Sequence, residues 1–195
     1  MGKIRYLIVL ALGLAATGCG INAIPEFDEQ VKAGWAQVEN QYQRRADLIP
    51  NLVETVKGFA AQERDVLVAV TEARSKVNQM SVDSDLVNNP EQLQAFEAAQ
   101  GELSGALSRL MVVVERYPEL RSNENFLALQ AQLEGTENRI SVARRDYIAA
   151  VQAYNSEIRT FPGRIWHSLL YSDLELRDTF EATTENAEQA PAVQF

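Results

Sequence analysis

The sequence is poor in the residues that build most metal, redox and hydrolytic sites. It contains one cysteine, Cys19, and one histidine, His167, in 195 residues. A structural zinc site needs about four Cys or His ligands and a disulfide needs a second cysteine, so neither is expected. Only Gly34 and Gly58 lie between residues 21 and 100, which leaves β-hairpins little turn chemistry there. These shortages predict an all-α protein that carries no metal or cofactor.

An excess of basic residues and a membrane-spanning stretch are also missing. The formal net charge is −9 at pH 7, so nucleic acid, whose phosphates attract basic surfaces, is not an expected partner. The apolar run at residues 6–16 is shorter than the roughly 20 residues that a spanning helix needs. A short basic start precedes it and small residues follow it, which is the order of a secretory signal.

The end of this signal predicts a lipid anchor. Ala16-Thr17-Gly18-Cys19 resembles the lipobox of bacterial lipoproteins, in which the cysteine thiol takes a diacylglycerol, with alanine where leucine is commonest. We therefore expect residues 1–18 to be removed, Cys19 to carry a covalent lipid, and residues 19–27 to form a short tether. Multiple acylation would make the attachment stable. The alternative is an ordinary signal peptide with a chance cysteine at its end.

In the first half of the chain, the residues expected to form a seam, the line along which one helix packs on another, recur every seven positions in two interleaved rows. One row contains Val31, Val38, Arg45, Leu52, Phe59, Val66, Ala73 and Met80, and the other contains Trp35, Tyr42, Ile49, Val56, Glu63, Val70 and Val77. Two such rows are typical of helices that pack side by side. Because the register does not slip at Pro50, the pattern favours one long helix over residues 28–80, kinked near that proline.

Start and stop signals predict two more long helices after a loop at residues 81–89. Asn89 provides a side-chain cap and the next residue is a proline, which suits the first helical position. Pro118 ends this second helix. Asn123 caps the third, which runs to Pro162-Gly163.

Short connections between long helices favour antiparallel neighbours. The expected fold is an elongated antiparallel bundle of three to four long helices over residues 28–182. A short amphipathic segment at residues 164–171 would close one end. Residues 183–195 form a polar, mostly loose tail.

A continuous run inside the first helix resembles a known family signature. Residues 44–59 read Arg-Arg-Ala-Asp-Leu-Ile-Pro-Asn-Leu-Val-Glu-Thr-Val-Lys-Gly-Phe, which is similar to the signature of the bacterial LemA family. Shorter matches follow in the same order, at Glu63-Arg64, Ala73-Arg74, Tyr117–Leu120, Tyr154-Asn155, Phe161-Pro162 and Pro191–Phe195. The resemblance implies an all-helical, membrane-tethered protein with no accepted enzymatic activity. Many relatives carry a longer N-terminal spanning helix, from which the lipobox departs.

Two charged residues interrupt the rows and are candidates for a functional site. Burying Arg45 or Glu63 without a partner of opposite charge would cost free energy. The two cannot pair with each other within one helix, because about 27 Å separates them, so each needs a partner on another helix. One interpretation is a buried polar contact that sets the register. The other is a partner or ligand site beside Pro50, which also leaves the Ala46 carbonyl without its helical donor. This site would contain Arg44, Arg45, Asp47, Asn51, Glu54, Lys57 and Glu63.

The remaining polar and aromatic residues are expected to serve the fold. We expect the aromatic stripe to lie in the core and His167 to be partly exposed. The stripe contains Trp35, Tyr42, Phe59, Phe96, Tyr147, Tyr154 and Phe161. The hydroxyls of Tyr147 and Tyr154 are expected to meet Arg45 or Glu63.

The sequence offers no catalytic constellation, so we expect no enzymatic activity. The expected function is that of a membrane-anchored interaction or scaffold protein of the cell envelope, with an unidentified envelope protein as partner. The alternative is a sensor or carrier that binds a small molecule or ion near Pro50. Export would place the bundle outside the cytoplasm. Gly20 after the cysteine, by the common lipoprotein rule, implies the outer membrane if the host has two. The oligomeric state is left open.

Overall fold

The computed structural model describes residues 20–80, 86 and 89–180. Within this part of the chain six helices form and no strand does. The helices are α2 (Ala23–Phe59), α3 (Arg64–Asn78), α4 (Pro90–Val114), α5 (Pro118–Arg121), α6 (Glu124–Arg159) and α7 (Gly163–Leu170). The predicted all-α fold is confirmed.

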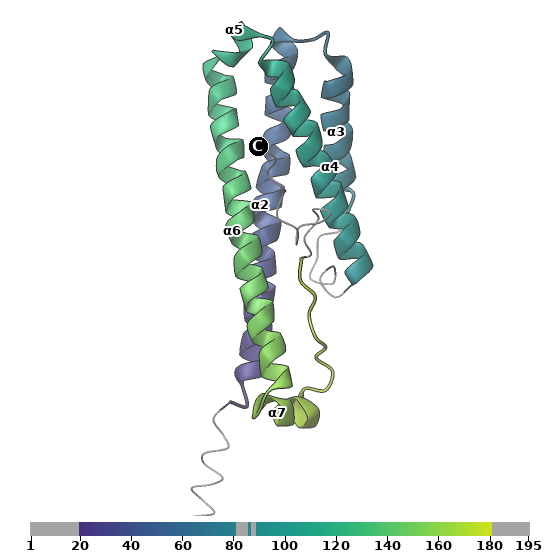
Figure 1. The fold of residues 1–195 in the computed structure, drawn as a ribbon, viewed down its shortest axis with the longest axis vertical. Helices are drawn as coiled ribbons and strands as arrows, with labels where there is room; N and C mark the ends of the chain where they lie inside the picture. The colour runs from purple at the N-terminus through teal and green to yellow at the C-terminus, as the bar shows by residue number, and fades with distance from the viewer. Residues whose placement is uncertain (1–19, 81–85, 87–88, 181–195) are drawn as a thin grey trace, which may run out of the picture.

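The four long helices lie side by side as an elongated rod (Figure 1). Successive long helices run in opposite directions, as the short connections predicted. The longest helices, α2 and α6, pack against each other closely, while α3 packs along α4 and beside α2. The short α5 closes one end of the rod and α7 lies at the other. None of the helices in the described residues has an apolar stretch long enough to cross a bilayer.

The predicted single helix over residues 28–80 is wrong, because the chain turns back between Phe59 and Arg64. The turn is closed by backbone hydrogen bonds from Ala60 to the Val56 carbonyl and from Glu63 to the Ala60 carbonyl. Both sequence rows continue into α3 because an antiparallel helix can present the same spacing to the core from the other side. The break falls where the rows weaken: Phe59 is 40% exposed and Glu63 is polar.

The α2 helix continues through Pro50. Proline has no N–H, so it leaves the carbonyl of Ala46 without its usual donor. Arg74 of α3 supplies the missing donor, and its Nε lies 2.8 Å from that carbonyl oxygen. The proline therefore creates an acceptor through which α3 is tied to α2.

The other helix boundaries follow their predicted signals. The Asn89 side chain accepts from the backbone N–H of Gln92 at 3.2 Å, and the Asn123 side chain accepts from that of Phe126 at 3.1 Å. The α4 helix ends at Val114, before Pro118, which starts the separate helix α5.

The core divides into two apolar clusters along the rod. One lies between α2, α3, α4 and α6 near the α5 end, and the other lies between α2, α6 and the first turns of α4, towards α7. In the second cluster Trp35 meets Tyr147 edge to face, with ring centroids 5.5 Å apart, and Phe180 packs against both rings. The aromatic prediction was wrong at two positions, since Phe59 and Phe161 are exposed. Both stand at the turns that end long helices.

Candidate functional site

Arg45 is buried, with 2% of its surface exposed, and joins three helices. From α2 its Nη1 donates to Ser104 Oγ of α4 at 3.0 Å and to Glu137 Oε1 of α6 at 2.9 Å. Its Nη2 donates to Gln100 Oε1 of α4. We call these four residues the Arg45 cluster. The cluster holds α4 and α6 against α2, which is the geometry expected for a buried polar contact that sets the register.

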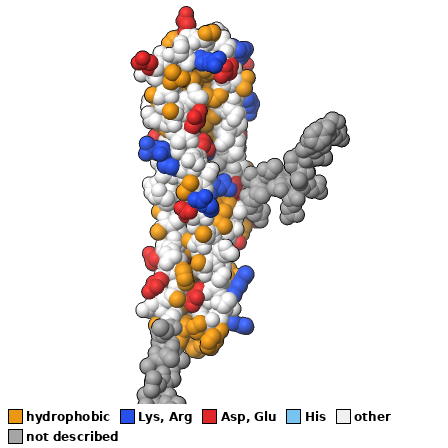
Figure 2. All heavy atoms as spheres, turned by 60° about the vertical axis from the view of Figure 1, so that its left-hand side comes forward, with side chains coloured by type: hydrophobic (Ala, Val, Ile, Leu, Met, Phe, Trp, Pro, Cys, Tyr) orange, Lys and Arg blue, Asp and Glu red, His pale blue; other side chains and the backbone are white. Residues whose placement is uncertain are grey.

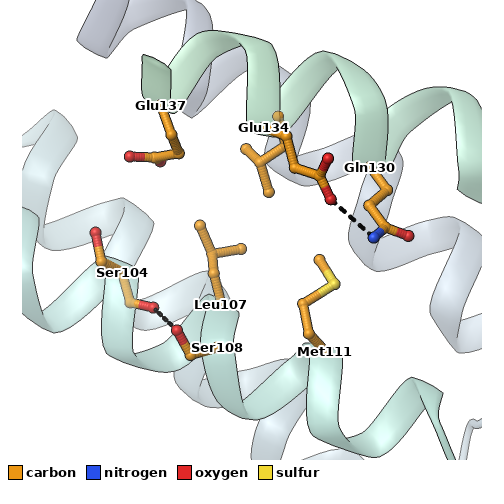
Figure 3. A pocket seen from close by; sticks show the side chains of 8 residues that line it. Ser104, Leu107, Ser108, Met111, Gln130, Glu134 and Glu137 are labelled. Atoms are coloured by element: carbon orange, nitrogen blue, oxygen red, sulfur yellow. Dashed lines mark hydrogen bonds between the residues drawn. The ribbon is translucent and has the colours of Figure 1, made fainter. Parts of the chain in front are cut away.

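A groove of about 350 Å³ opens beside the Arg45 cluster, between α4 and α6 (Figure 3). Leu107, Met111 and Leu133 give it apolar walls. Its polar lining consists of Ser104, Ser108, Gln130, Glu134 and Glu137. Figure 3 shows the α6 side chains facing those of α4 across the space. Because Glu137 is paired with Arg45, the groove offers apolar walls and the carboxylate of Glu134 to a molecule with an apolar body and a positive charge.

The remaining predicted residues on α2 lie on its solvent side. Arg44, Asp47, Asn51 and Glu54 are exposed and lie three or four positions apart, so they form one line along the helix, which we call the outer stripe. Lys57 continues it and pairs with Glu54 at 3.2 Å.

The fold makes little use of this stripe. The carboxylate of Asp47 accepts from Gln43, one turn earlier, at 2.8 Å. Within the described residues Arg44 and Asn51 have no side-chain hydrogen bond or ion pair with another helix. The end of the stripe borders a second groove, of about 450 Å³, between α2 and α3.

Glu63 lies apart from the Arg45 cluster, at the turn before α3. Its carboxylate accepts from Tyr117 Oη at 2.8 Å and pairs with Arg116 Nη2 at 3.1 Å. The hydrogen bond to this carboxylate raises the pKa of Tyr117. The structure thus divides the seven predicted residues among an interhelical tie, an exposed stripe and a contact at the turn.

Two further charged groups are buried that the sequence reasoning did not single out. Asp28 of α2 lies 2.9 Å from Arg177 Nη2 and 2.9 Å from Lys32 Nζ. Burial acts to raise the pKa of Asp28, but the hydrogen bonds from Lys32 and Arg177 outweigh it and hold the pKa below its ordinary value. Glu97 of α4 pairs with Arg144 of α6 at 2.7 Å. The burial of Asp28 could have been predicted from the sequence, because it lies four residues after Ile24 and three before Val31, at the spacing of the buried face.

The hydroxyls of Tyr147 and Tyr154 do not meet Arg45 or Glu63 as predicted. They donate to the backbone carbonyls of Asp178 and Glu175, at 3.1 and 2.9 Å. Burial raises the pKa of both phenols. Residues 171–180 therefore run along the rod as a strap that covers the aromatic core, and an apolar pattern carries no information about such a backbone partner.

His167 is half-buried, as expected, and its Nε2 lies 2.7 Å from the Leu174 carbonyl. Across residues 20–80, 86 and 89–180, no three His, Cys, Asp or Glu side chains are grouped closely enough to hold a metal ion. The predicted lipid-bearing residue, Cys19, and the predicted tail at residues 183–195 lie outside the described residues.

Comparison with known proteins gives one family and several named relatives. The model of the LemA family matches residues 34–195. The magnetosome proteins MamQ 1 and MamQ 2 of Paramagnetospirillum magneticum are each 29% identical over 166 residues, which cover 77% of this chain and 60% of theirs. Protein LemA of Metamycoplasma hominis is 21% identical over 155 residues, which cover 80% of this chain and 65% of that protein. The chain thus spans about three fifths of the length of the MamQ relatives.

Proposed function

The chain belongs to the LemA family, and from that premise we propose that it is a lipid-anchored, non-enzymatic interaction protein of the bacterial cell envelope. It would hold a helical rod at a membrane surface and offer one side of α2 to a protein partner. The two parts of this proposal, the anchor and the interacting face, rest on different observations and are tested separately.

The anchor is supported by the N-terminal sequence. A basic start, a short apolar run and Ala16-Thr17-Gly18 precede the only cysteine in the chain. Acylation of Cys19 would attach the protein to a membrane without a spanning helix. Gly20 directly after it supports carriage to the outer membrane, facing the periplasm, in a host with two membranes.

The proposal of an interacting face rests on one observation: in the LemA-like run of α2, the polar side chains of the outer stripe form no hydrogen bond or ion pair with another described helix. The inward residues Ile49, Leu52 and Val56 are buried, and Arg45 ties the helices together. The outer stripe on the same run points to solvent. A line of charges of both signs and an amide on a rigid helix fits a partner helix or loop of complementary charge.

The anchor test compares the wild type with Cys19→Ala in a lipoprotein-competent bacterium. Intact mass should show that the wild type has lost residues 1–18 and gained acyl chains, and that it fractionates with the membrane. The variant should gain no lipid. Wild-type protein that keeps its signal or carries no acyl mass would contradict the anchor.

The face test uses a photo-crosslinking amino acid in place of Asn51, in intact envelopes. A discrete adduct should form and should be lost in Arg44→Ala/Asp47→Ala, with the melting temperature unchanged because neither side chain bonds to another helix. The matched control carries the same probe in place of Gln132, an exposed residue of α6. An adduct that survives the double substitution, or that forms equally at the control position, would refute the proposed face.

The groove between α4 and α6 favours a second candidate function, a sensor or carrier, although none of the seven residues predicted for a site near Pro50 lines it. Its ligand would be a small molecule with an apolar body and a positive charge, bound over Leu107 and Leu133 beside Glu134. A cationic detergent monomer is a suitable probe, and binding to the folded state should raise the melting temperature. Ser108→Trp, which fills the groove from an exposed position, should abolish that rise. An equal rise in the variant would exclude the groove as the site.

A further inference from the structure

The end of the rod that carries α7 has a concentration of exposed apolar side chains. Phe161 is 83% exposed, Leu169 is 69% exposed, and Ile165 and Leu170 are about half exposed. Ile165 and Leu169 are four apart within α7, so they lie on one side of that helix, and Phe161 lies in the turn directly before it. Hydrophobic side chains gather at this end of the molecule (Figure 2). Other large apolar side chains exposed on the described residues, such as Val112, Val142 and Ile148, are spread along the rod.

This apolar side cannot turn inward, because α7 is fixed from its other side. Trp166 packs against the second apolar cluster, the one towards α7, and His167 bonds to the Leu174 carbonyl. Gly163, at the start of α7, lies so close to Glu157 that a Cβ there would stand 2.2 Å from the Glu157 carbonyl oxygen. The helix is therefore held against α6 with Ile165 and Leu169 facing outward.

The described part of the chain begins at the same end of the rod. A Cβ on Gly20 would lie 3.7 Å from Pro162 Cγ, so the backbone of residue 20 runs against the turn that enters α7. Cys19 is bonded directly to this residue in the sequence, so a lipid on its side chain would be attached close to the turn. A lipid on Cys19 would therefore enter the bilayer beside Phe161 and α7.

The charges around this end also fit a lipid surface. Arg159 and Arg164 are exposed, on either side of the Phe161-Pro162 turn, and neither forms an ion pair with another described residue. Their guanidinium groups can donate to lipid phosphates while the neighbouring apolar side chains enter the acyl boundary. Among the acids near this end, Glu157 is half-buried, while Glu26 of α2 and Asp173 of the strap are exposed.

We propose that α7 and the turn before it rest in the headgroup region of the membrane that holds the lipid of Cys19, with Phe161, Ile165 and Leu169 inserted. The rod then stands on the bilayer with α5 at its far end. This inference rests on the proposed anchor and adds to it, because a tether alone would bring α7 near the membrane without inserting it.

A spin label on Leu169→Cys tests the contact in the full-length, acylated protein in vesicles of phosphatidylethanolamine and phosphatidylglycerol. Acylation blocks the thiol of Cys19, so the introduced thiol is the only one that reacts. Val112→Cys is the matched control, since Val112 is also 69% exposed but lies at the end of α4 that leads into α5. The label at position 169 should be several-fold less accessible to a nickel chelate, and more accessible to oxygen, than the label at position 112.

A second variant separates insertion from simple proximity. Phe161→Ser/Ile165→Ser, made in the labelled protein, should restore nickel access at position 169 while the melting temperature and acyl mass stay unchanged. Equal nickel access at positions 169 and 112 in acylated protein would overturn the inference and leave the anchor standing. So would shielding that persists in the serine variant. A protein without acyl mass would refute the anchor and this inference with it.

Discussion

The Arg45 cluster predicts a strong energetic coupling between α2 and α6. Glu137→Gln keeps the shape of the side chain but removes the only carboxylate among the described residues that pairs with the buried guanidinium of Arg45. Unit charges about 4 Å apart interact by about 4 kcal/mol at an effective dielectric constant of about 20. Part of that is regained, since Glu137 is 44% exposed and Gln100 and Ser104 still accept from Arg45. We expect the substitution to cost about 2–3 kcal/mol, less than the loss of a fully buried pair.

A double-mutant cycle isolates this interaction from the packing role of the arginine. In an Arg45→Met background the Arg45 cluster no longer contains a buried charge, so Glu137→Gln should cost almost nothing, giving a coupling of about 2–3 kcal/mol. The measurement is urea unfolding followed by circular dichroism, and the loss in the single variant corresponds to about 4–12 °C in melting temperature for a domain of this size.

The control for this cycle is Glu134→Gln, one turn away on α6. Its carboxylate accepts from Gln130 at 2.9 Å and is exposed to solvent, so the change should stay within about 0.5 kcal/mol. A coupling below about 0.5 kcal/mol between Arg45 and Glu137 would refute the reasoning. Water would then screen the pair, and the cluster would not tie α6 to α2.

Three further predictions concern other parts of the fold. Because the pKa of Asp28 is lowered on folding, its stabilising effect is complete above its unfolded pKa of about 3.8 and is lost as the pH falls through the lower folded value, so the urea midpoints of wild type and Asp28→Asn should converge in acid. Gly163→Ala should destabilise the fold by about 1–3 kcal/mol because the added Cβ meets a backbone oxygen. Gly101→Ala, with open space around it, should stabilise the fold by up to about 1 kcal/mol, and thermal unfolding followed by circular dichroism measures both changes. Arg74→Met should cost about 1–2 kcal/mol in the wild type but less in Pro50→Ala, where the restored backbone N–H supplies a donor to the same carbonyl; equal costs in both backgrounds would contradict this.

The helix class and most boundaries were predictable because they depend on local chemistry. Asn89 and Asn123 cap helices through their own side chains, and Pro118 begins a new helix where the pattern stopped. The turn between Phe59 and Arg64 was missed because no proline or glycine occupies it, and because a seven-residue row looks the same in one long helix and in two that fold back.

The candidate site was predicted in part. Seam position correctly marked Arg45 as a residue that needs partners on other helices, but not which ones, since Gln100 and Glu137 lie 55 and 92 residues away in sequence. The outer stripe follows from helical spacing alone. The partners of Tyr147 and Tyr154 were not predictable, because they are backbone carbonyls of an irregular strap, and neither periodicity nor propensity places such a segment.

The strap also sets the order in which this protein can become folded. Its Arg177 pairs with Asp28 across 149 residues of sequence, and Phe180 completes the aromatic core around Trp35, near the beginning of α2. Contacts this distant in sequence form slowly, because a long loop must close before they contribute. A chain emerging from a ribosome or a translocation pore cannot complete the apolar cluster towards α7 until residue 180 has passed. The bundle therefore stays incompletely folded until residues 20–180 have all been delivered to one compartment.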